Sequence, residues 1–536
     1  MKRHIVACTI SVGLLLSICL VNQGMALAHF RIVHESTPAK PLPLHQEPIG
    51  STIVEETSPA TYRSVNYYCP QPWWDFWKKW PETRDAMHRD MPVLHELGVN
   101  TVRIFVHPAT FGWPADGPPG VPNETQLNQL DELLNILAQF KLKARLCLFD
   151  LFGEFDKIDE SVRWMERLMG RFRKHAGLAM WELKNEVDMS NADVRRWILG
   201  CFPHFKRLAG PTPVSISVSA VKAKRFTWRA TLQDLVTLTP FDFYDVHFYA
   251  WDDLVWVSPI EADILDAVDI VGPERLLIHE VGQSTFGEYS EALQRDTLKT
   301  IFYFGARAGV RHWGVWTYND FVYGTRIGVN LAPESELGFG LCRLDGSKKL
   351  AAETVRSFFS GLPPSSPAAP TLYNSGFDDS DYRNGALEGW RSWRSDIGWG
   401  GAELIRDSGR LRSGISSARL TTTADAVAGF FNVPACAIRS GQTITAGGYV
   451  WMDNLPPGSN ARLVASWHSD EGVWLGMDSY GNAVTSGGDL PHAWIPLSLT
   501  AEAPPGAAHL QLFVQVSCPL SGQFAWFDDF SMSVTQ

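Results

Sequence analysis

Two apolar runs, Trp181-Glu182-Leu183-Lys184-Asn185-Glu186 and Leu276-Leu277-Ile278-His279-Glu280, each end in a carboxylate. Both belong to a longer series of strand-like runs, which lie at residues 62–67, 101–106, 143–149, 179–185, 213–219, 243–248, 275–279 and 310–317. The gaps between the runs carry apolar residues at three- and four-residue steps, a spacing typical of amphipathic helices. One example is the series Leu127, Leu130, Leu133, Leu134 and Leu137.

This alternation predicts the fold class. Strands that are separated by helices pair in parallel, and eight such units in about 300 residues match a (β/α)8 TIM barrel, an α/β fold, over residues 61–361. The alternative is a doubly wound open sheet, but no glycine-rich phosphate loop follows the first run. We therefore expect a closed barrel.

Other segments flank the barrel. Residues 1–28 combine a basic start, an apolar stretch and an Ala26-Leu27-Ala28 cleavage site, which predicts a secretory signal peptide. Residues 29–60 are predicted to be a flexible leader, and residues 362–370 a proline-rich linker. Residues 371–536 lose the helical periodicity and show short alternating runs, which predicts an all-β sandwich of the jelly-roll kind.

Composition limits the class of partner. A net charge of −11 over 536 residues argues against nucleic acid, and no apolar run of about 18 residues follows the signal segment, so we expect no membrane span. A secreted monomer is the expectation. The cysteines beyond the signal segment form no Cys-x-x-Cys pair, which argues against a metal cluster. Cys436 and Cys518 are the pair favoured for a disulfide.

Several polar residues stand near the ends of the strand-like runs, where a barrel of this type places its active residues. Arg103 lies in the second run, and Asp150 follows the third. The later runs are closed by polar residues: the fourth by Asn185 and Glu186, the sixth by His247 and Tyr249, and the seventh by Glu280, while Trp316 lies late in the eighth. Two carboxylates that meet at one edge are what cleavage of a glycosidic bond needs. One acid protonates the leaving oxygen, and the other attacks the anomeric carbon or activates water.

The set Asn185-Glu186, His247-Phe248-Tyr249, Glu280-Val281-Gly282 and Trp316, preceded by Arg103, resembles clan A of the retaining glycoside hydrolases. Within that clan it is most similar to family 5, the cellulases and mannanases, over roughly residues 60–360. Val281 stands where that family often has an aromatic residue, and a further His or Asn of the family near the third run is not assigned.

The resemblance implies a role for each of these residues. Glu186 would be the general acid/base and Glu280 the nucleophile. Asn185 would bind the sugar 2-hydroxyl, and Arg103 and Tyr249 would lie near the nucleophile, with His247 supporting the network. The resemblance also implies that Trp316 is the floor of the subsite next to the cleaved bond.

Such a carboxylate pair carries further expectations. Retention of configuration needs the two carboxyl groups about 5–5.5 Å apart. Arg103 should lower the pKa of Glu280, and an anionic Glu280 should raise the pKa of Glu186. Strict alternation would send Asn185 and Glu186 to opposite faces, so the strand should end or bulge before them. The two chemical steps call for no metal and no organic cofactor.

Aromatic and acidic residues indicate further contacts. Trp73, Trp74 and Trp251 follow strand-like runs on the active face and are expected to stack on sugar rings. In the C-terminal segment, Asn374-Ser375-Gly376-Phe377-Asp378 and Trp526-Phe527-Asp528-Asp529-Phe530 resemble jelly-roll carbohydrate-binding modules. That resemblance implies a structural calcium at Asp378 and Asp529. The alternative is a sandwich that only stabilises or spaces the barrel.

Together these patterns favour a secreted retaining β-glycosidase that acts by double displacement on a β-linked polysaccharide or oligosaccharide, of the β-glucan or β-mannan type. Two alternatives stay open. One is a non-catalytic carbohydrate-binding or scaffold protein built on a barrel, against which the two glutamates and their polar neighbours speak. The other is a transglycosylase that uses the same residues.

Overall fold

The computed structural model describes residues 61–69, 75–113, 120–220, 227–249, 251–252, 256–257, 260–324, 326–327, 330–364, 372–381, 385–399, 401–421, 426–452, 455–470, 472–486, 492–517 and 523–535. The predicted signal peptide and leader, most of the predicted linker and Cys518 lie outside these residues. Among the described residues, no helix has both the length and the apolar character that a membrane span requires.

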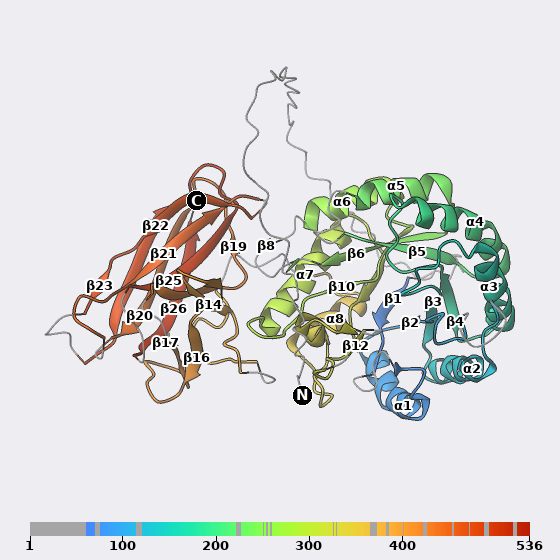
Figure 1. The fold of residues 1–536 in the computed structure, drawn as a ribbon, viewed down its shortest axis with the longest axis horizontal. Coiled ribbons are helices and arrows are strands. Elements are labelled where there is room, and N and C mark those ends of the chain that lie inside the picture. The colour runs from blue at the N-terminus through green and yellow to red at the C-terminus, as the bar shows by residue number, and fades with distance from the viewer. Residues whose placement is uncertain are drawn as a thin grey trace, which may run out of the picture. The chain divides into compact units, whose positions relative to one another are not determined.

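Parallel strands close into a barrel, as the sequence predicts (Figure 1). Around the barrel they run in the order β1 (Arg63–Asn66), β2 (Thr101–Phe105), β3 (Lys143–Cys147), β4 (Leu178–Glu182), β5 (Val214–Ser219), β6 (Phe243–Tyr249), β9 (Leu276–Ile278) and β11 (His312–Val315). Pairing of β11 with β1 closes the ring, which excludes the open-sheet alternative. A two-residue strand, β10 (Val281–Gly282), follows β9 and pairs with β6.

Helices surround the strands (Figure 1). They are α1 (Trp80–Glu96), α2 (Glu124–Gln139), α3 (Ile158–Phe172), α4 (Ala192–Ala209), α5 (Trp228–Leu238), α6 (Ile260–Val271), α7 (Glu291–Arg307) and α8 (Leu350–Phe359). Side-chain caps begin several of them: Asn123 Oδ1, for example, accepts the backbone N–H of Gln126 at the start of α2. The leucines that predict α2 are buried against the barrel.

Barrel strands use their two faces differently. In β2, Val102 and Ile104 belong to the apolar core that the strands share with the helices. Arg103, between them, points into the barrel and binds acidic residues there. This period of two follows from the pleat of a strand, and it explains why charged residues occur inside otherwise apolar runs.

The C-terminal part forms two antiparallel sheets on one apolar core, as predicted. One sheet contains β14 (Trp390–Arg394), β15 (Gly398–Trp399), β18 (Ala428–Asn432), β19 (Cys436–Ala437), β21 (Asn460–His468), β22 (Trp474–Tyr480), β23 (Val484–Thr485) and β25 (His509–Ser517). The other contains β16 (Glu403–Asp407), β17 (Ser417–Thr421), β20 (Thr443–Trp451), β24 (Ile495–Glu502) and β26 (Ala525–Thr535). Trp390 is buried in the core between them.

The segment that leads into α7 contacts residues of the sandwich. Tyr289 and Leu293 share a small apolar cluster with Phe431 and Val433. Glu288 forms an ion pair with Arg391. The barrel and the sandwich are therefore joined by side-chain contacts as well as by the chain itself.

Candidate active site

The two glutamates that the sequence predicts as the catalytic pair lie together at one end of the barrel. Glu280 comes directly before β10, and Glu186 follows β4. Three atoms lie within 4.8 Å of one another: one carboxylate oxygen of Glu186, one of Glu280 and a ring nitrogen of His247. The Glu186 side chain is 29% exposed and that of Glu280 only 7%, so incoming molecules reach Glu186 more easily.

The backbone after β4 turns Glu186 toward the site. β4 ends at Glu182, as the expectation that Asn185 and Glu186 both face the site requires. Glu186 then adopts a φ of +47°, a left-handed conformation that a non-glycine residue holds at a cost of about 1–3 kcal/mol. Its N–H donates to Ser217 Oγ at 2.8 Å, a bond that anchors this conformation to β5.

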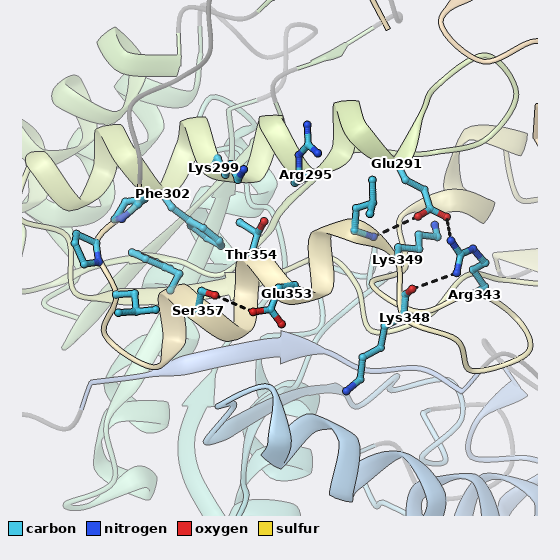
Figure 2. Close-up of a pocket in the computed structure, with 15 residues that line it drawn as sticks. Glu291, Arg295, Lys299, Phe302, Arg343, Lys348, Lys349, Glu353, Thr354 and Ser357 are labelled. Atoms are coloured by element: carbon cyan, nitrogen blue, oxygen red, sulfur yellow. Dashed lines mark hydrogen bonds and ion pairs between the residues drawn. The ribbon is translucent and has the colours of Figure 1, made fainter. Parts of the chain in front are cut away.

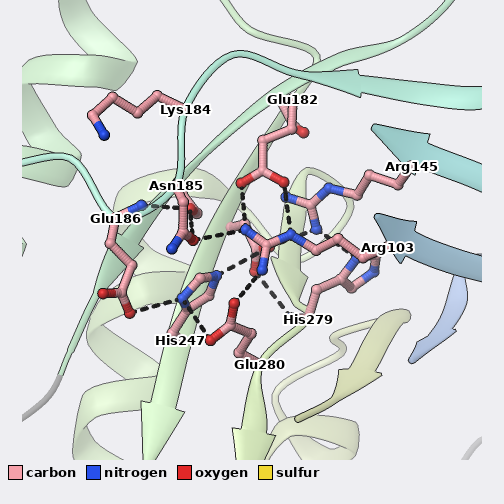
Figure 3. A network of polar contacts seen from close by, with 12 residues as sticks. Arg103, Arg145, Glu182, Lys184, Asn185, Glu186, His247, His279 and Glu280 are labelled. Atoms are coloured by element: carbon pink, nitrogen blue, oxygen red, sulfur yellow. Dashed lines mark hydrogen bonds and ion pairs between the residues drawn. The ribbon is translucent and has the colours of Figure 1, made fainter. Parts of the chain in front are cut away.

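Both oxygens of Glu280 have partners. Arg103 Nη1 binds Oε1. Tyr249 donates its hydroxyl to Oε2 at 2.8 Å, and His247 Nδ1 lies 3.3 Å from the same oxygen. The same nitrogen of His247 lies 3.0 Å from Oε1 of Glu186, so one imidazole nitrogen contacts both glutamates (Figure 3).

Arg103 uses all of its donors inside the barrel. Its Nε and Nη2 bind the two oxygens of Glu182 at 2.7 Å each. Nη1 reaches Asn66 Oδ1 at 3.0 Å as well as Glu280, and Nη2 reaches Asn185 Oδ1 at 2.8 Å. This fixed fork geometry is a property of guanidinium that lysine does not share.

These contacts belong to a ring of alternating charges. From Glu280 it passes through Arg103 and Glu182 to Arg145 (Figure 3). From Arg145 it continues through Asp245 and His247 and returns to Glu280. The contacts of Arg145 with Glu182 and Asp245 measure 3.0 and 2.6 Å, and Asp245 lies 3.5 Å from His247 Nε2. Buried charges are stable only when they are paired, and in this ring every charge has two opposite neighbours.

The ring sets the protonation of its members. Burial lowers the pKa of His247, but Glu280 and Asp245 outweigh it and raise the pKa to about 10, so the imidazole is positively charged at neutral pH. For Glu280 burial is the largest influence and raises the pKa, against His247 and Arg103, which lower it. Arg103 thus acts in the expected direction, but the net shift is upward because the carboxyl is desolvated.

Trp316 lies at one side of the site and packs against a stack of aromatic rings. Tyr68 and Phe105 lie parallel, with centroids 5.5 Å apart, and His107 is parallel to both. Trp316 meets Tyr68 and Phe105 edge-on, at 6.4 and 6.2 Å. His107 Nδ1 lies 3.5 Å from Asp150 Oδ2.

The sequence interpretation missed Tyr68 and His107. Both stand within three residues of a strand end, Tyr68 after β1 and His107 after β2. A position just beyond a barrel strand is the signal that could have found them. Of the expected aromatic contacts, Trp73 and Trp74 lie outside the described residues, and for Trp251 only the backbone is described, in β7 (Trp251–Asp252).

The triad of Glu186, His247 and Glu280 has the spacing of a metal site, but its chemistry fits ion pairs better. The charges of Glu280 and Asp245 raise the pKa of His247, so a metal would have to compete with a proton for the imidazole. Arg103 already holds one oxygen of Glu280.

The expected calcium ligands contact the segment 412–416. Asp378 Oδ1 accepts the N–H groups of Ile415 at 2.7 Å and Ser416 at 3.0 Å. Asp529 binds Arg412 and Ser413. A calcium ion would have to displace these donors, and the site stays a prediction.

A pocket of about 620 Å³ lies between α7 and α8 (Figure 2). None of the candidate catalytic residues lines it. Several of its charged groups are paired, as in the Arg343–Glu291 contact of 2.6 Å and the buried Lys349–Asp320 contact of 2.6 Å. We assign no chemistry to this pocket.

Neither a protein-family model nor a curated protein sequence matches the chain. Among solved structures, an exo-β-1,4-mannosidase, Op5Man5 from Opitutaceae bacterium strain TAV5, is 19% identical with a TM-score of 0.46, over 61% of this chain and 65% of that one. The match thus spans less than two thirds of the mannosidase.

Two other structures match different shares of the chain. GH5_18 from Bifidobacterium longum is 16% identical with a TM-score of 0.45, over 58% of this chain and 82% of that one. The CBM22-1 xylan-binding domain of Paenibacillus barcinonensis Xyn10C is 14% identical with a TM-score of 0.25, over 32% of this chain and 97% of that one. None of these scores reaches 0.5, so the function proposed below rests on the site itself.

Proposed function

We propose that this protein is a retaining β-glycosidase in which Glu280 is the nucleophile and Glu186 the general acid/base. The observation that carries the proposal is the pair of carboxylate oxygens within 4.8 Å of one another. Retaining enzymes hold their carboxyl groups about 5–5.5 Å apart, whereas inverting enzymes need about 6.5–9.5 Å to admit a water molecule. The short separation suits direct attack on the sugar.

In the first step an oxygen of Glu280 forms a bond to the anomeric carbon while the bond to the leaving oxygen breaks. Glu186 gives its proton to that oxygen. Arg103 and Tyr249 orient the Glu280 carboxylate for this attack. Asn185, whose Oδ1 is held by Arg103, is placed to bind the sugar 2-hydroxyl.

Charge is conserved within the site during this step. Before it, Arg103, Arg145 and His247 face the anions Glu182, Asp245 and Glu280. A further negative charge on Glu186 would exceed these cations, which favours the protonated acid. When Glu280 becomes an ester, its negative charge passes to Glu186, and His247 Nδ1 contacts both carboxylates. Glu186 is then the base that takes a proton from water, and water breaks the ester bond.

The substrate class follows from this chemistry together with the sequence. We infer a β-linked glucan, mannan or oligosaccharide, and export of the protein rests on the predicted signal peptide. If a sugar hydroxyl replaces water in the second step, the same residues perform transglycosylation. Analysis of product lengths at rising acceptor concentration separates the two reactions, because transfer makes products longer than the substrate.

The sandwich is proposed to bind carbohydrate through β22. Trp474 and Tyr480, 53% and 55% exposed, are an even number of residues apart and share one face of this edge strand. Arg462 covers one side of the Tyr480 ring, 4.3 Å from its centroid. Loss of binding to insoluble β-glucan or β-mannan in Trp474→Ala would support this role. Unchanged binding would favour a spacing or stabilising role for the sandwich.

The deciding experiment follows the stereochemistry. A panel of aryl β-glycosides and β-linked polysaccharides identifies a substrate, and NMR at early times then shows which anomer of the released sugar forms first. We expect the β-anomer. An α-anomer as the first product would contradict double displacement, and a panel without any cleaved substrate would favour the non-catalytic alternative.

A further inference from the structure

A third carboxylate, Glu336, lies beside the proposed catalytic pair. It belongs to a short 3-10 helix, η3 (Glu334–Gly338), beyond β11, and its side chain is half-buried. The indole N–H of Trp316 donates a hydrogen bond to it. It lies close enough to Glu280, Glu186 and the hydroxyl of Tyr249 for its charge to interact with these groups.

The segment that carries Glu336 is tightly held. The backbone oxygen of Leu337 accepts the N–H of Phe321 at 3.0 Å. The oxygen of Gly338 accepts the N–H of Thr285 at 3.0 Å and an Nζ hydrogen of Lys349 at 2.9 Å. A Cβ on Gly338 would lie 2.6 Å from the nearest backbone nitrogen, so the close approach requires glycine. The carboxylate is therefore presented from a rigid support.

The same segment also touches the other wall of the site. Phe339 meets the ring of Tyr249 edge-on, with centroids 5.7 Å apart, and Tyr249 binds Glu280. Residues 336–339 therefore contact both Trp316 and Tyr249. A sugar held over Trp316, with its anomeric carbon between Glu186 and Glu280, would bring other ring positions near Glu336.

The acceptor capacity of Glu336 that the described residues leave unused indicates what it binds. A carboxylate has about four acceptor positions, and Trp316 supplies one N–H. Vicinal hydroxyls of a pyranose are a pair of donors that matches the two oxygens of one carboxylate. Charge-assisted bonds of this kind are about twice as strong as neutral ones, so the contact would discriminate between sugars.

We propose that Glu336 is a specificity-determining residue that accepts hydrogen bonds from ring hydroxyls, among those at C3, C4 and C6, of the sugar whose glycosidic bond is cleaved. The assignment rests on the proposed glycosidase function. It concerns a neutral pyranoside with free hydroxyls, and it gives the third carboxylate a part in binding rather than in bond cleavage.

The environment of Glu336 adds a pH signature. Burial, followed by the charge of Glu280, raises its pKa to about 7. The carboxyl thus changes from a neutral to an anionic acceptor near neutral pH, and the anion is the stronger acceptor. Recognition of a hydroxylated sugar should improve as the pH rises through about 7, and that of a sugar without the hydroxyl should not.

The test compares Glu336→Gln with wild type on matched substrates. These are the 4-nitrophenyl β-D-mannoside or β-D-glucoside, whichever wild type cleaves faster, and its 3-, 4- and 6-deoxy analogues. We expect Glu336→Gln to lower kcat/KM on the parent sugar about 10- to 150-fold, the effect of a hydrogen bond to a charged group. On at least one deoxy analogue the two proteins should differ by much less. Glu334→Gln, on the exposed side of the same helix, is the control and should match wild type.

Each outcome decides the question. An equal loss on the parent and on every deoxy analogue would assign Glu336 a structural role and overturn the proposal, and so would the absence of any loss on the parent. If wild type cleaves no glycoside at all, the proposed function fails and this inference fails with it. If wild type is active and Glu336→Gln is indistinguishable from it, only the inference fails.

Discussion

The hydroxyl of Tyr249 offers a direct measure of how the protein holds its proposed nucleophile. It donates to Oε2 of Glu280 at 2.8 Å, and a hydrogen bond to a charged group contributes about 1.5–3 kcal/mol. Tyr249→Phe removes that bond with little change in shape. Because the bond favours the ionised carboxylate, its loss should raise the pKa of Glu280 by about 1–2 units, at 1.36 kcal/mol per unit.

The pKa of Glu280 is already raised by burial, and the protonated acid cannot attack. The acid limb of kcat/KM, which reports the free enzyme, should therefore move to higher pH by about 1–2 units in Tyr249→Phe. A 2,4-dinitrophenyl β-glycoside is the substrate to use, because its leaving group needs little help from Glu186. Below the shifted limb, the rate should fall about 10- to 100-fold relative to wild type.

A matched control lies on the same strand. Tyr244 is buried in β6 and donates its hydroxyl to the backbone oxygen of Thr239 at 2.6 Å. Tyr244→Phe makes the same chemical change away from the carboxylates and should leave the acid limb in place. If the acid limb of Tyr249→Phe coincides with that of wild type, Glu280 is not the group that titrates in that limb, and the nucleophile assignment is refuted.

Three further changes probe the other assignments. Glu280→Ala should lose several orders of magnitude in turnover. Added azide should restore turnover on dinitrophenyl glycosides and yield the α-glycosyl azide, because azide takes the place of the missing carboxylate. A β-glycosyl azide would contradict attack from the face of Glu280. Glu186→Ala should keep its rate of glycosyl-enzyme formation on dinitrophenyl glycosides and lose it on alkyl glycosides, and equal damage on both would count against the acid role. A chain that ends at Pro363 exposes Tyr289 and Leu293, so its free energy of unfolding in urea should be lower by about 3 kcal/mol. Its activity on soluble oligosaccharides should be retained. An unchanged unfolding midpoint would mean that the contact with the sandwich contributes no stability.

The barrel could be predicted because its strands are buried on both faces and form dense apolar runs. The predicted run 310–317 contains β11, which the structure bounds at His312 and Val315. Glu186 and Glu280 stand just beyond predicted strands, and the rule that active residues follow strand ends brought both into one site. Arg103 joins them from within β2, where the alternation of the strand turns it into the barrel. Candidate active residues that follow the end of an apolar run can therefore be recognised from the sequence.

Glu336 could not be predicted in this way. It stands in Pro333-Glu334-Ser335-Glu336, a stretch with the composition of an exposed loop, well beyond the end of β11. Its place beside Trp316 depends on contacts that bring Lys349 and Thr285 to Gly338. Such long-range contacts leave no periodic pattern in the sequence, because each depends on how the whole barrel closes.

The ring of buried charges explains which substitutions report on chemistry and which report on folding. The side chains of Glu182 and Asp245 have no exposed surface, and each neutralises two buried cations. Removing one partner of a buried ion pair costs about 3–5 kcal/mol, so their variants would lose activity together with stability. Tyr249 lies outside the ring and carries no charge, and its removal leaves every ion pair in place. The pH profile of Tyr249→Phe therefore reports the ionisation of Glu280 alone. In variants of the ring residues, the same profile would combine changes in ionisation with loss of folded protein.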